Sequence, residues 1–341
     1  MDMPRLNEWP LPDAARTTYR FVRGLYRAGR ATGHRLCNLI DRPVIVLLYH
    51  RVTELSADPE LIAVSPENFR RHMEFLKQHF LILRLADEWP ELRKPAVIIT
   101  FDDGYADNVL EALPILEEVG VPATFFISTA QVGTDRVFWW HRLEAMLLRQ
   151  GEFPSRFELH DPGYERVWMT ASPEQRQVLY ASLGMRMRRL DPERRESWLG
   201  QLEQWAGPGI VPADLHRLMT RAELRRLAGS PRATVGAHTV SHSALAALTE
   251  EQQRREIFLS KIELEKMIGK KITTFSYPFG RKSEYNRISV DLCREAGFTR
   301  AVANFPGQVH RWTDPLQLPR HLVRNWDLET FAMELKGFWT R

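Results

Sequence analysis

The sequence predicts an α/β protein built on a parallel sheet. Apolar runs of four to six residues, typical of strands buried on both faces, alternate with segments that have the hydrophobic pattern of helices. Strands that alternate with helices form parallel sheets joined by right-handed crossovers. The predicted strands are residues 44–49, 96–101, 123–128, 234–237, 273–277 and 300–303.

Cap residues support the predicted helices. Ser65 resembles an N-cap, and Pro66 behind it suits the first helical position, so a helix is expected to run to about His79. A second helix follows Gly104 and is expected to end at Gly120. Further helices are predicted at about 220–229, 249–268 and 286–296.

Two regions depart from this alternation. Residues 131–219 are rich in Trp, Arg and Glu, have a helical pattern and show no convincing buried strand. We expect a helical insertion that either covers a binding cleft or decorates the barrel without contact to a ligand. Residues 1–42 form a basic N-terminal segment, in which Arg20 and Arg23 share one face of an amphipathic helix. That helix suits either an anionic membrane surface or packing across the barrel.

Composition bounds the function classes. Hydrophobic residues make up 44% of the 341 residues and charged residues 26%, which suffices for an ordinary core. No apolar run has the length of a signal peptide or a transmembrane helix, so we expect a cytoplasmic protein with peripheral contact to the inner membrane face as a further possibility. The net charge of +4 is not organised in a base-reading motif, so nucleic acid is not an expected partner. Cys37 and Cys293 suggest neither a disulfide framework nor a metal cluster.

Reactive side chains gather where the predicted strands end. Asp102 and Asp103 follow the second strand, and His238 and His242 follow the fourth. Strand ends of a parallel sheet share one face, so these groups are expected to lie together. Adjacent buried carboxylates need a cation or a proton, and two imidazoles with one carboxylate can hold a metal with positions left open. Taken alone, a DDG tripeptide is more often a solvated turn, and an H-x-x-x-H pair is more often two surface histidines.

Together the motifs resemble those of polysaccharide deacetylases, the NodB-homology domains of carbohydrate esterase family 4. The resemblance rests on TFDDG at 100–104 and HTVSH at 238–242, with ATFF at 123–126 as the strand that follows the first motif. It covers about 43–130 and 218–325 in the family's motif order. The fold that it implies is a distorted parallel (β/α) barrel with fewer than eight strands, here spanning 43–341 with the insertion inside it.

The resemblance also implies roles for the strand-end residues. Asp103, His238 and His242 would bind a divalent metal, and Asp102 would be the general base. Zinc is the family's usual metal, although two histidines and a carboxylate also suit other first-row metals. The oxyanion would be stabilised by the metal and by the backbone N–H of Phe279.

Two family motifs depart from the usual pattern. The third, usually R-x-P-x-G, is here Ser276 followed by Tyr277, Pro278, Phe279 and Gly280, a Y-P-F-G version familiar from a subgroup of these proteins. Arg320 is a candidate for the missing guanidinium, and the alternative is a surface arginine. The last motif, which carries a general-acid histidine, is not recognisable. His50 is the first candidate for that role, ahead of His310 and His321, although a strand-end histidine is often structural. Trp140 is either a sugar platform or a core residue.

The resemblance implies a metal-dependent hydrolase that removes N-acetyl groups from a sugar of a polysaccharide or a lipid-linked glycan precursor. A glycan deformylase, an O-acetyl esterase and a catalytically degenerate glycan-binding barrel are the alternatives. The four motif residues Asp102, Asp103, His238 and His242 oppose the degenerate barrel. The sequence leaves the sugar, the acyl group, the metal and the oligomeric state open.

Overall fold

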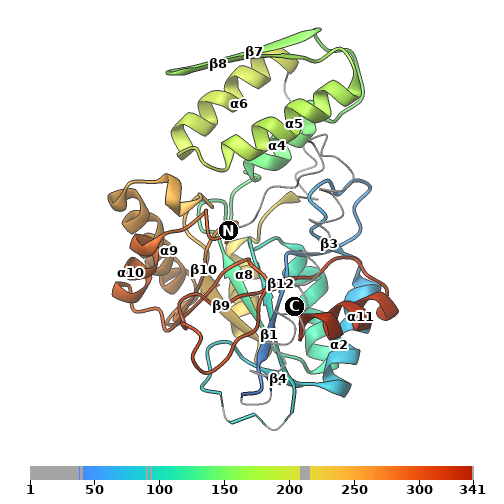
Figure 1. Ribbon diagram of the computed structural model, residues 1–341, viewed down its shortest axis with the longest axis vertical. Coiled ribbons are helices and arrows are strands. Elements are labelled where there is room, and N and C mark those ends of the chain that lie inside the picture. The colour runs from blue at the N-terminus through green and yellow to red at the C-terminus, as the bar shows by residue number, and fades with distance from the viewer. Residues whose placement is uncertain (1–37, 39–40, 90, 93, 208–215, 340–341) are drawn as a thin grey trace, which may run out of the picture.

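One curved sheet of parallel strands lies at the centre of the barrel, with helices around it (Figure 1). The computed structural model describes residues 38, 41–89, 91–92, 94–207 and 216–339. In this part of the chain, seven strands follow one another in the order β11-β10-β9-β6-β5-β1-β12, and every pair is parallel. Their bounds are β1 Val44–Tyr49, β5 Ala96–Phe101, β6 Ala123–Ile127, β9 Ala233–Ala237, β10 Thr274–Ser276, β11 Arg300–Val302 and β12 His321–Leu322.

The residues around β12 bring the two edges of this sheet together. β12 pairs with β1, while Leu318, three residues before it, forms a parallel bridge with Val302 of β11. The N–H of Ala303 donates to the carbonyl of Leu318 at 2.8 Å. The sheet is therefore a distorted parallel (β/α) barrel with seven strands along its path, as the sequence resemblance implied.

All six predicted strands are present, with bounds within two residues of those expected. Two short strands were missed. β4 (Leu81–Leu83) pairs with the first half of β5, beside the stretch that pairs with β6, and β12 has only two residues. Neither β4 nor β12 is long enough to show the hydrophobic pattern of a strand in the sequence. Outside the barrel sheet, β2 (Arg51–Val52) and β3 (Ala63–Val64) form a small parallel pair.

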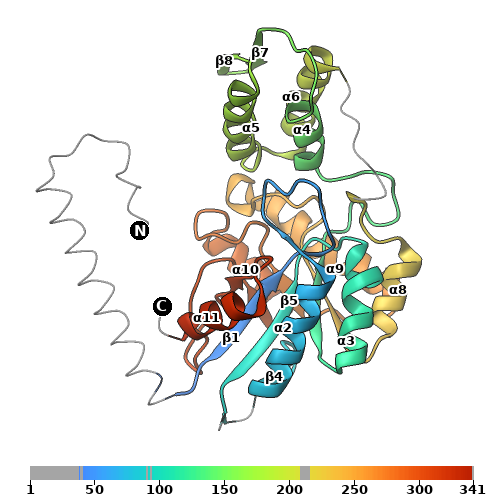
Figure 2. The same ribbon diagram turned by 90° about the vertical axis from the view of Figure 1, so that its right-hand side faces the viewer.

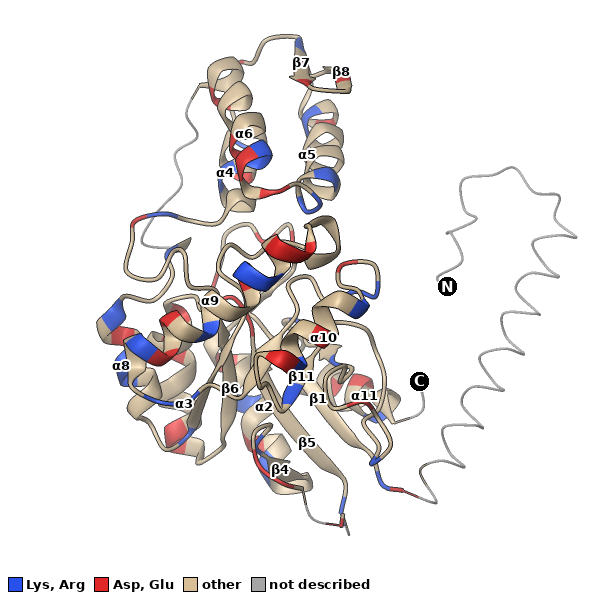
Figure 3. Ribbon diagram, turned by 90° about the vertical axis from the view of Figure 1, so that its left-hand side faces the viewer, with Lys and Arg blue, Asp and Glu red and all other residues tan. Residues whose placement is uncertain are grey.

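Helices cover the outside of the barrel, and their capping residues act as predicted. α2 (Pro66–His79) begins after Ser65, whose side chain accepts from the N–H of Asn68, and it packs beside α11 (Leu328–Phe338) (Figure 1). α8 (Arg221–Gly229), α9 (Glu250–Ile268) and α10 (Arg287–Glu295) follow one another around the barrel. The short 3-10 helix η3 (Leu245–Ala247) precedes α9. Both basic and acidic residues occur on α8 and α9 (Figure 3).

The helix expected after Gly104 begins with a turn of π-helix. η2 (Asn108–Ala112) leads into α3 (Leu113–Val119), which ends at Gly120 with φ 82°. Pro114 has no N–H to donate to the turn before it, so the wider turn falls where the regular hydrogen-bond ladder is broken. This turn directs Asn108 toward the barrel mouth, where its side-chain amide donates to the carbonyl of His50 at 2.8 Å.

Residues 131–207 form a second layer beyond the carboxyl ends of the strands (Figure 2). This layer contains three helices, α4 (Trp139–Leu147), α5 (Pro173–Met187) and α6 (Pro192–Ala206), and has a hydrophobic cluster of its own that includes Leu143, Leu183 and Leu199. It also contains an antiparallel hairpin, β7 (Arg156–Asp161) and β8 (Tyr164–Met169). The expectation of no strand here was therefore wrong. Only one face of this hairpin is buried, so it lacks the apolar run of a barrel strand.

Most of the N-terminal segment, including the predicted basic helix and Cys37, lies outside the described residues. Cys293 is buried in α10 with a free thiol. No helix within the described ranges is long and apolar enough to cross a membrane.

Two glycines offer a matched test of how tightly the barrel is packed. A Cβ at Gly236 of β9 would lie 2.5 Å from the ring of Phe126 and 2.7 Å from the hydroxyl of Thr274, whereas a Cβ at Gly200 of α6 would meet nothing within 4 Å. We expect Gly236→Ala to lower the free energy of unfolding by about 1–3 kcal/mol through overpacking. Gly200→Ala should raise it by about 0.5–1 kcal/mol, because alanine is the better helix former. Denaturant unfolding measures both, and equal effects of the two variants would contradict the packing of β9.

Candidate metal and active site

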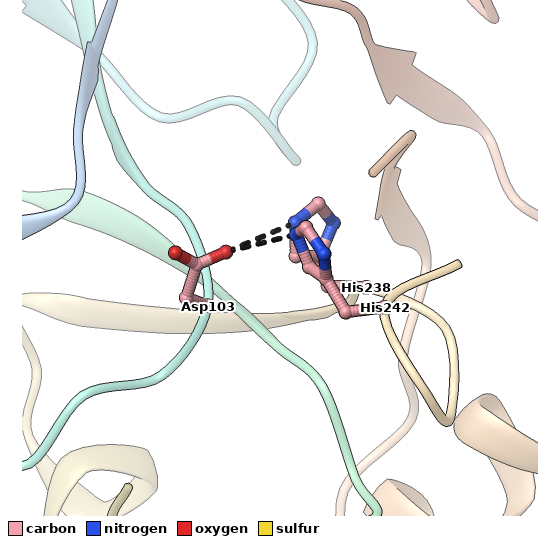
Figure 4. A group of neighbouring side chains, drawn as sticks. All are labelled: Asp103, His238 and His242. Atoms are coloured by element: carbon pink, nitrogen blue, oxygen red, sulfur yellow. Dashed lines mark ion pairs between the residues drawn. The ribbon is translucent and has the colours of Figure 1, made fainter. Parts of the chain in front are cut away.

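Asp103, His238 and His242 converge at the carboxyl ends of β5 and β9 (Figure 4). Nε2 of His242 lies 3.1 Å from Oδ1 of Asp103, and Nε2 of His238 lies 3.5 Å from the same oxygen. One donor atom from each residue falls within 4.8 Å of the others, and all three side chains are buried. The structure therefore brings together the two motifs that lie more than 130 positions apart in the sequence.

Unusual backbone conformations position these side chains. Asp103 has φ 76° and His242 has φ 53°, and Thr239 and Phe279 are also in the left-handed region, which side chains other than glycine rarely adopt. Leu61 is the one other such non-glycine residue in the described ranges. Four costly conformations in one place indicate a site whose geometry is maintained by the surrounding structure.

The two histidines are oriented for their Nε2 atoms to act as ligands. Nδ1 of His238 donates to the carbonyl of Ser276 at 2.7 Å, which leaves the lone pair on Nε2 directed at Asp103. The loop between the histidines is held by Glu256 of α9, whose carboxylate accepts from the N–H groups of Val240 and Ser241 at 2.9 and 2.8 Å. Two neutral imidazoles and one carboxylate match the donor set of a catalytic zinc site, so these residues fit a divalent metal.

Asp102 lies beside the three candidate ligands but faces a different partner. Nη1 and Nη2 of Arg320 donate to Oδ1 and Oδ2 of Asp102 at 2.7 and 2.6 Å, and the hydroxyl of Ser276 donates to Oδ2 at 3.1 Å. Arg320 is 1% exposed. Burial alone would raise the pKa of the Asp102 carboxyl, but the charge and hydrogen bonds of Arg320, together with the nearby imidazoles of His238 and His50, hold that pKa below its usual value. Asp102 is therefore held ionised 3.8 Å from Nε2 of His238.

His50 lines the same cavity from the end of β1. Its Nδ1 is buried and has no hydrogen-bond partner in the part of the chain that the structure describes. Burial lowers the pKa of the His50 imidazole, and the nearby carboxylates of Asp103 and Asp102 only partly oppose this. The other two candidate histidines lie elsewhere: His310 lines a separate cavity with Asp41, and His321 stacks on Phe338.

The four residues of the variant third motif take different positions. Phe279 lines the cavity, and its ring contacts His242 with centroids 4.7 Å apart. Its backbone N–H has no hydrogen-bond partner among the described residues. Tyr277 lies behind the site, fully buried, and donates its hydroxyl to the carbonyl of Leu316, so its side chain is not part of the cavity wall. After Pro278, Gly280 has φ 62° and permits close approach, since a Cβ there would lie 2.4 Å from the N of Asn304.

Trp140 is both a core residue and part of the cavity wall. It is 8% exposed, stacks on Phe138 with ring centroids 4.2 Å apart, and meets the ring of His242 edge-on at 5.0 Å. Its indole N–H donates to the hydroxyl of Tyr105 at 3.2 Å. The inserted layer therefore contacts the candidate ligand directly and contributes to the cavity wall.

The cavity also contains residues that sequence reasoning missed. Glu60 follows no predicted element. Tyr180 lies on α5 of the inserted layer, and Arg188 directly follows that helix. Arg281 and Arg324 come from loops after β10 and β12. No motif marks them, because they reach the site through the folding of the insertion and the barrel closure. The full lining is His50, Glu60, Ile62, Asp102, Asp103, Trp139, Trp140, Leu143, Tyr180, Gly184, Arg188, His238, His242, Phe279, Arg281, Asn304, Leu322 and Arg324.

Comparisons with known proteins identify the family of this chain. The family model described as polysaccharide deacetylase matches residues 90–178 and 202–301, more than half of the chain. Among curated proteins, YxkH of Bacillus subtilis (strain 168), whose name carries the words polysaccharide deacetylase, is 23% identical over 276 residues. That match covers 78% of this chain and 66% of YxkH, so the chain spans just under two thirds of that relative.

Solved structures resemble the fold at low sequence identity. The Streptococcus pyogenes deacetylase PplD in complex with acetate is 16% identical with a TM-score of 0.53, covering 86% of this chain and 98% of PplD. IcaB from Ammonifex degensii is 17% identical with a TM-score of 0.55, covering 88% and 97% of the two chains. At these identities the likeness concerns the fold alone, whereas the family match includes both motifs of the site. The chain belongs to the polysaccharide deacetylase family.

Proposed function

We propose that this protein is a metal-dependent hydrolase that removes N-acetyl groups from a sugar in a polysaccharide or a lipid-linked glycan precursor. The observation that supports the proposal is that two adjacent carboxylates have different partners. Asp103 faces His238 and His242, while both oxygens of Asp102 are engaged by Arg320. One carboxylate is thus available as a ligand, and its neighbour is kept ionised outside the ligand set.

Asp103, His238 and His242 would hold the metal, with zinc as the first choice. A divalent cation there would lower the pKa of water and polarise the acyl carbonyl. The hydrogen bond from His238 to the carbonyl of Ser276 keeps its ring in the ligating tautomer. Trp140 and Phe279 pack against the ring of His242 and restrict its rotation.

Asp102 is the general base in this account. An ionised carboxylate can accept the proton of the attacking water, and Arg320 keeps Asp102 both charged and fixed in direction. Arg320 thereby supplies the guanidinium that the family's third motif would otherwise provide from position 276. It is a positioning residue, because it acts through Asp102.

Phe279 and His50 complete the proposed machinery. The unpaired N–H of Phe279 is available to the oxyanion that develops when the acyl carbon is attacked. His50 is proposed to give a proton to the departing amine, since an amide anion cannot leave. Its lowered pKa makes the imidazolium a stronger acid, although less populated at neutral pH.

The substrate proposal rests on the cavity wall and on the family. Trp140 offers an aromatic edge beside the ligand set, where a sugar ring could pack. A cytoplasmic protein, as the sequence predicts, would meet glycan precursors rather than mature wall polymers. The basic segment at residues 1–42 would suit peripheral contact with the inner membrane face, where lipid-linked precursors lie.

Acetate release tests the proposed reaction. Purified protein, stripped of metal and resupplied with zinc or cobalt, should release acetate from N-acetylated sugars or glycolipids only when metal is present. Asp102→Asn should lower kcat by about 10²- to 10⁴-fold while retaining bound metal, because it removes the base and no ligand. His238→Ala should lose both the metal and the activity.

His160→Ala serves as the matched control, because His160 lies on the exposed hairpin outside the cavity. Release of formate, or of acetate from O-acetylated sugars alone, would replace the N-acetyl specificity with that of a deformylase or an esterase. Neither product and no bound metal would contradict the hydrolase and favour a glycan-binding barrel.

Moving the guanidinium tests the role of Arg320. Arg320→Ser should lower kcat by at least about 100-fold, since Asp102 loses its orientation. Combining it with Ser276→Arg should recover part of that loss, because the Ser276 hydroxyl lies 2.9 Å from Nη2 of Arg320 and contacts the same Asp102 oxygen.

The control is Arg176→Ser, another buried arginine, whose Nε donates to the carbonyl of Leu147 in the inserted layer. It should change stability without changing kcat. Equal losses of kcat in Arg176→Ser and Arg320→Ser, at equal metal content, would show that Arg320 acts only through stability.

A further inference from the structure

We propose that the sugar substrate carries a phosphoryl group close to its acylated ring, and that Arg281 and Arg324 bind this group. This inference rests on the proposed function and names a substrate class for the same cavity. It is based on the charges of the cavity wall, most of which are already compensated.

Three carboxylates line the cavity, and each has a charged partner or a proposed metal. Asp102 is paired with Arg320, and Asp103 faces the two histidines. The carboxylate of Glu60 pairs with Arg188, the C-cap residue of α5, at 3.1 Å and accepts from the hydroxyl of Tyr180 at 3.0 Å. No acidic side chain of the lining is therefore left to balance a further cation.

Arg281 is the first uncompensated cation. Its side chain is exposed and lines the cavity, and it makes no ion pair or hydrogen bond to any described residue. Its backbone is well anchored: the carbonyl of Gly280 accepts from the N–H of Asn304, and the carbonyl of Arg281 accepts from the N–H of Glu284, both at 2.8 Å. The guanidinium therefore extends from a fixed loop directly after the third motif.

Arg324 is the second cation of the cavity wall that has no acidic partner among the described residues. Its Nη1 donates to the carbonyl oxygens of Glu60 and Leu61, at 3.3 and 2.6 Å, and no carboxylate in the described ranges pairs with it. These bonds orient the guanidinium and leave its charge unbalanced. The preceding residue, Val323, donates to the carbonyl of Leu48 at 2.9 Å, so Arg324 too is attached to the barrel rather than to a free loop.

Two arginines from separate loops favour a phosphoryl group over a carboxylate. A planar carboxylate is satisfied by one guanidinium fork, whereas a phosphate offers three acceptor oxygens and can accept from several directions. A neutral polymer of N-acetylated sugars would leave both positive charges without a partner. A sugar joined through a phosphate ester, either free or in a lipid-linked precursor, would neutralise them.

Acetate release from matched substrates tests this preference. The pair is N-acetylglucosamine 1-phosphate and the neutral methyl glycoside of the same sugar. The protein should have a kcat/KM at least about fivefold higher for the phosphate, a preference that should weaken in high salt. Arg281→Gln should bring the ratio toward one by lowering kcat/KM for the phosphate more than for the neutral sugar.

Lys282→Gln is the matched control, because Lys282 is adjacent, exposed and equally charged but does not line the cavity. It should leave the ratio unchanged. N-acetylglucosaminuronic acid tests the carboxylate alternative, and an equal or greater preference for it would overturn the phosphoryl assignment. The farnesyl phosphodiester of the sugar distinguishes the two phosphate sources, since a further gain in kcat/KM would identify the lipid-linked form.

Binding separates failure of this inference from failure of the proposed function. Ligand-observed NMR compares the affinities of the same two sugars for the full chain after a chelator has removed its metal. The phosphate then has no metal to bind. Tighter binding of the phosphate that Arg281→Gln abolishes would support the inference even if no acetate were released. Turnover of both sugars at equal kcat/KM, with equal binding, would overturn it and leave the deacetylase standing.

Discussion

The buried ion pair between Asp102 and Arg320 joins the chemistry of the site to the closure of the barrel. Arg320 lies between the bridge from Leu318 to β11 and the pairing of β12 with β1, so the segment that connects the two edges of the sheet also carries the guanidinium. A buried carboxylate without this partner would tend to take up a proton. Paired with Arg320, the Asp102 carboxylate stays ionised and fixed in direction, and it does not join the candidate metal ligands beside it. The closure of the barrel and the proposed role of Asp102 as general base therefore depend on the same contact.

The inserted layer extends this dependence to the substrate side. Trp140 of α4 contacts His242. Arg188, at the end of α5, pairs with Glu60 and lies over the ring of Phe279. Parallel barrels place loops above the strand ends. Here one of those loops contains an insertion of three helices and a hairpin, with a hydrophobic cluster between them. Because the layer forms a wall of the cavity, changes within it are expected to alter the choice of substrate more than the bond that is broken.

Much of the barrel could be predicted from local patterns. Six strands and the five barrel helices between them were found because each buried strand is a continuous apolar run and the helices carry cap residues such as Ser65, whereas α11 was missed. The hairpin was missed because half-exposed strands lack such a run. Asp102, Asp103, His238 and His242 were found because they belong to local motifs at strand ends. The cavity arginines were not, since Arg281 and Arg324 come to line one cavity only through tertiary structure, and no spacing in the sequence marks this.

A crystal structure of the zinc-loaded protein would show which of the two adjacent carboxylates binds the metal. Anomalous scattering at the zinc edge would locate the ion. We expect one ion about 2.0–2.2 Å from Asp103, His238 and His242, with Asp102 still paired to Arg320. An ion ligated by Asp102, or a zinc site elsewhere with these three side chains empty, would contradict this expectation.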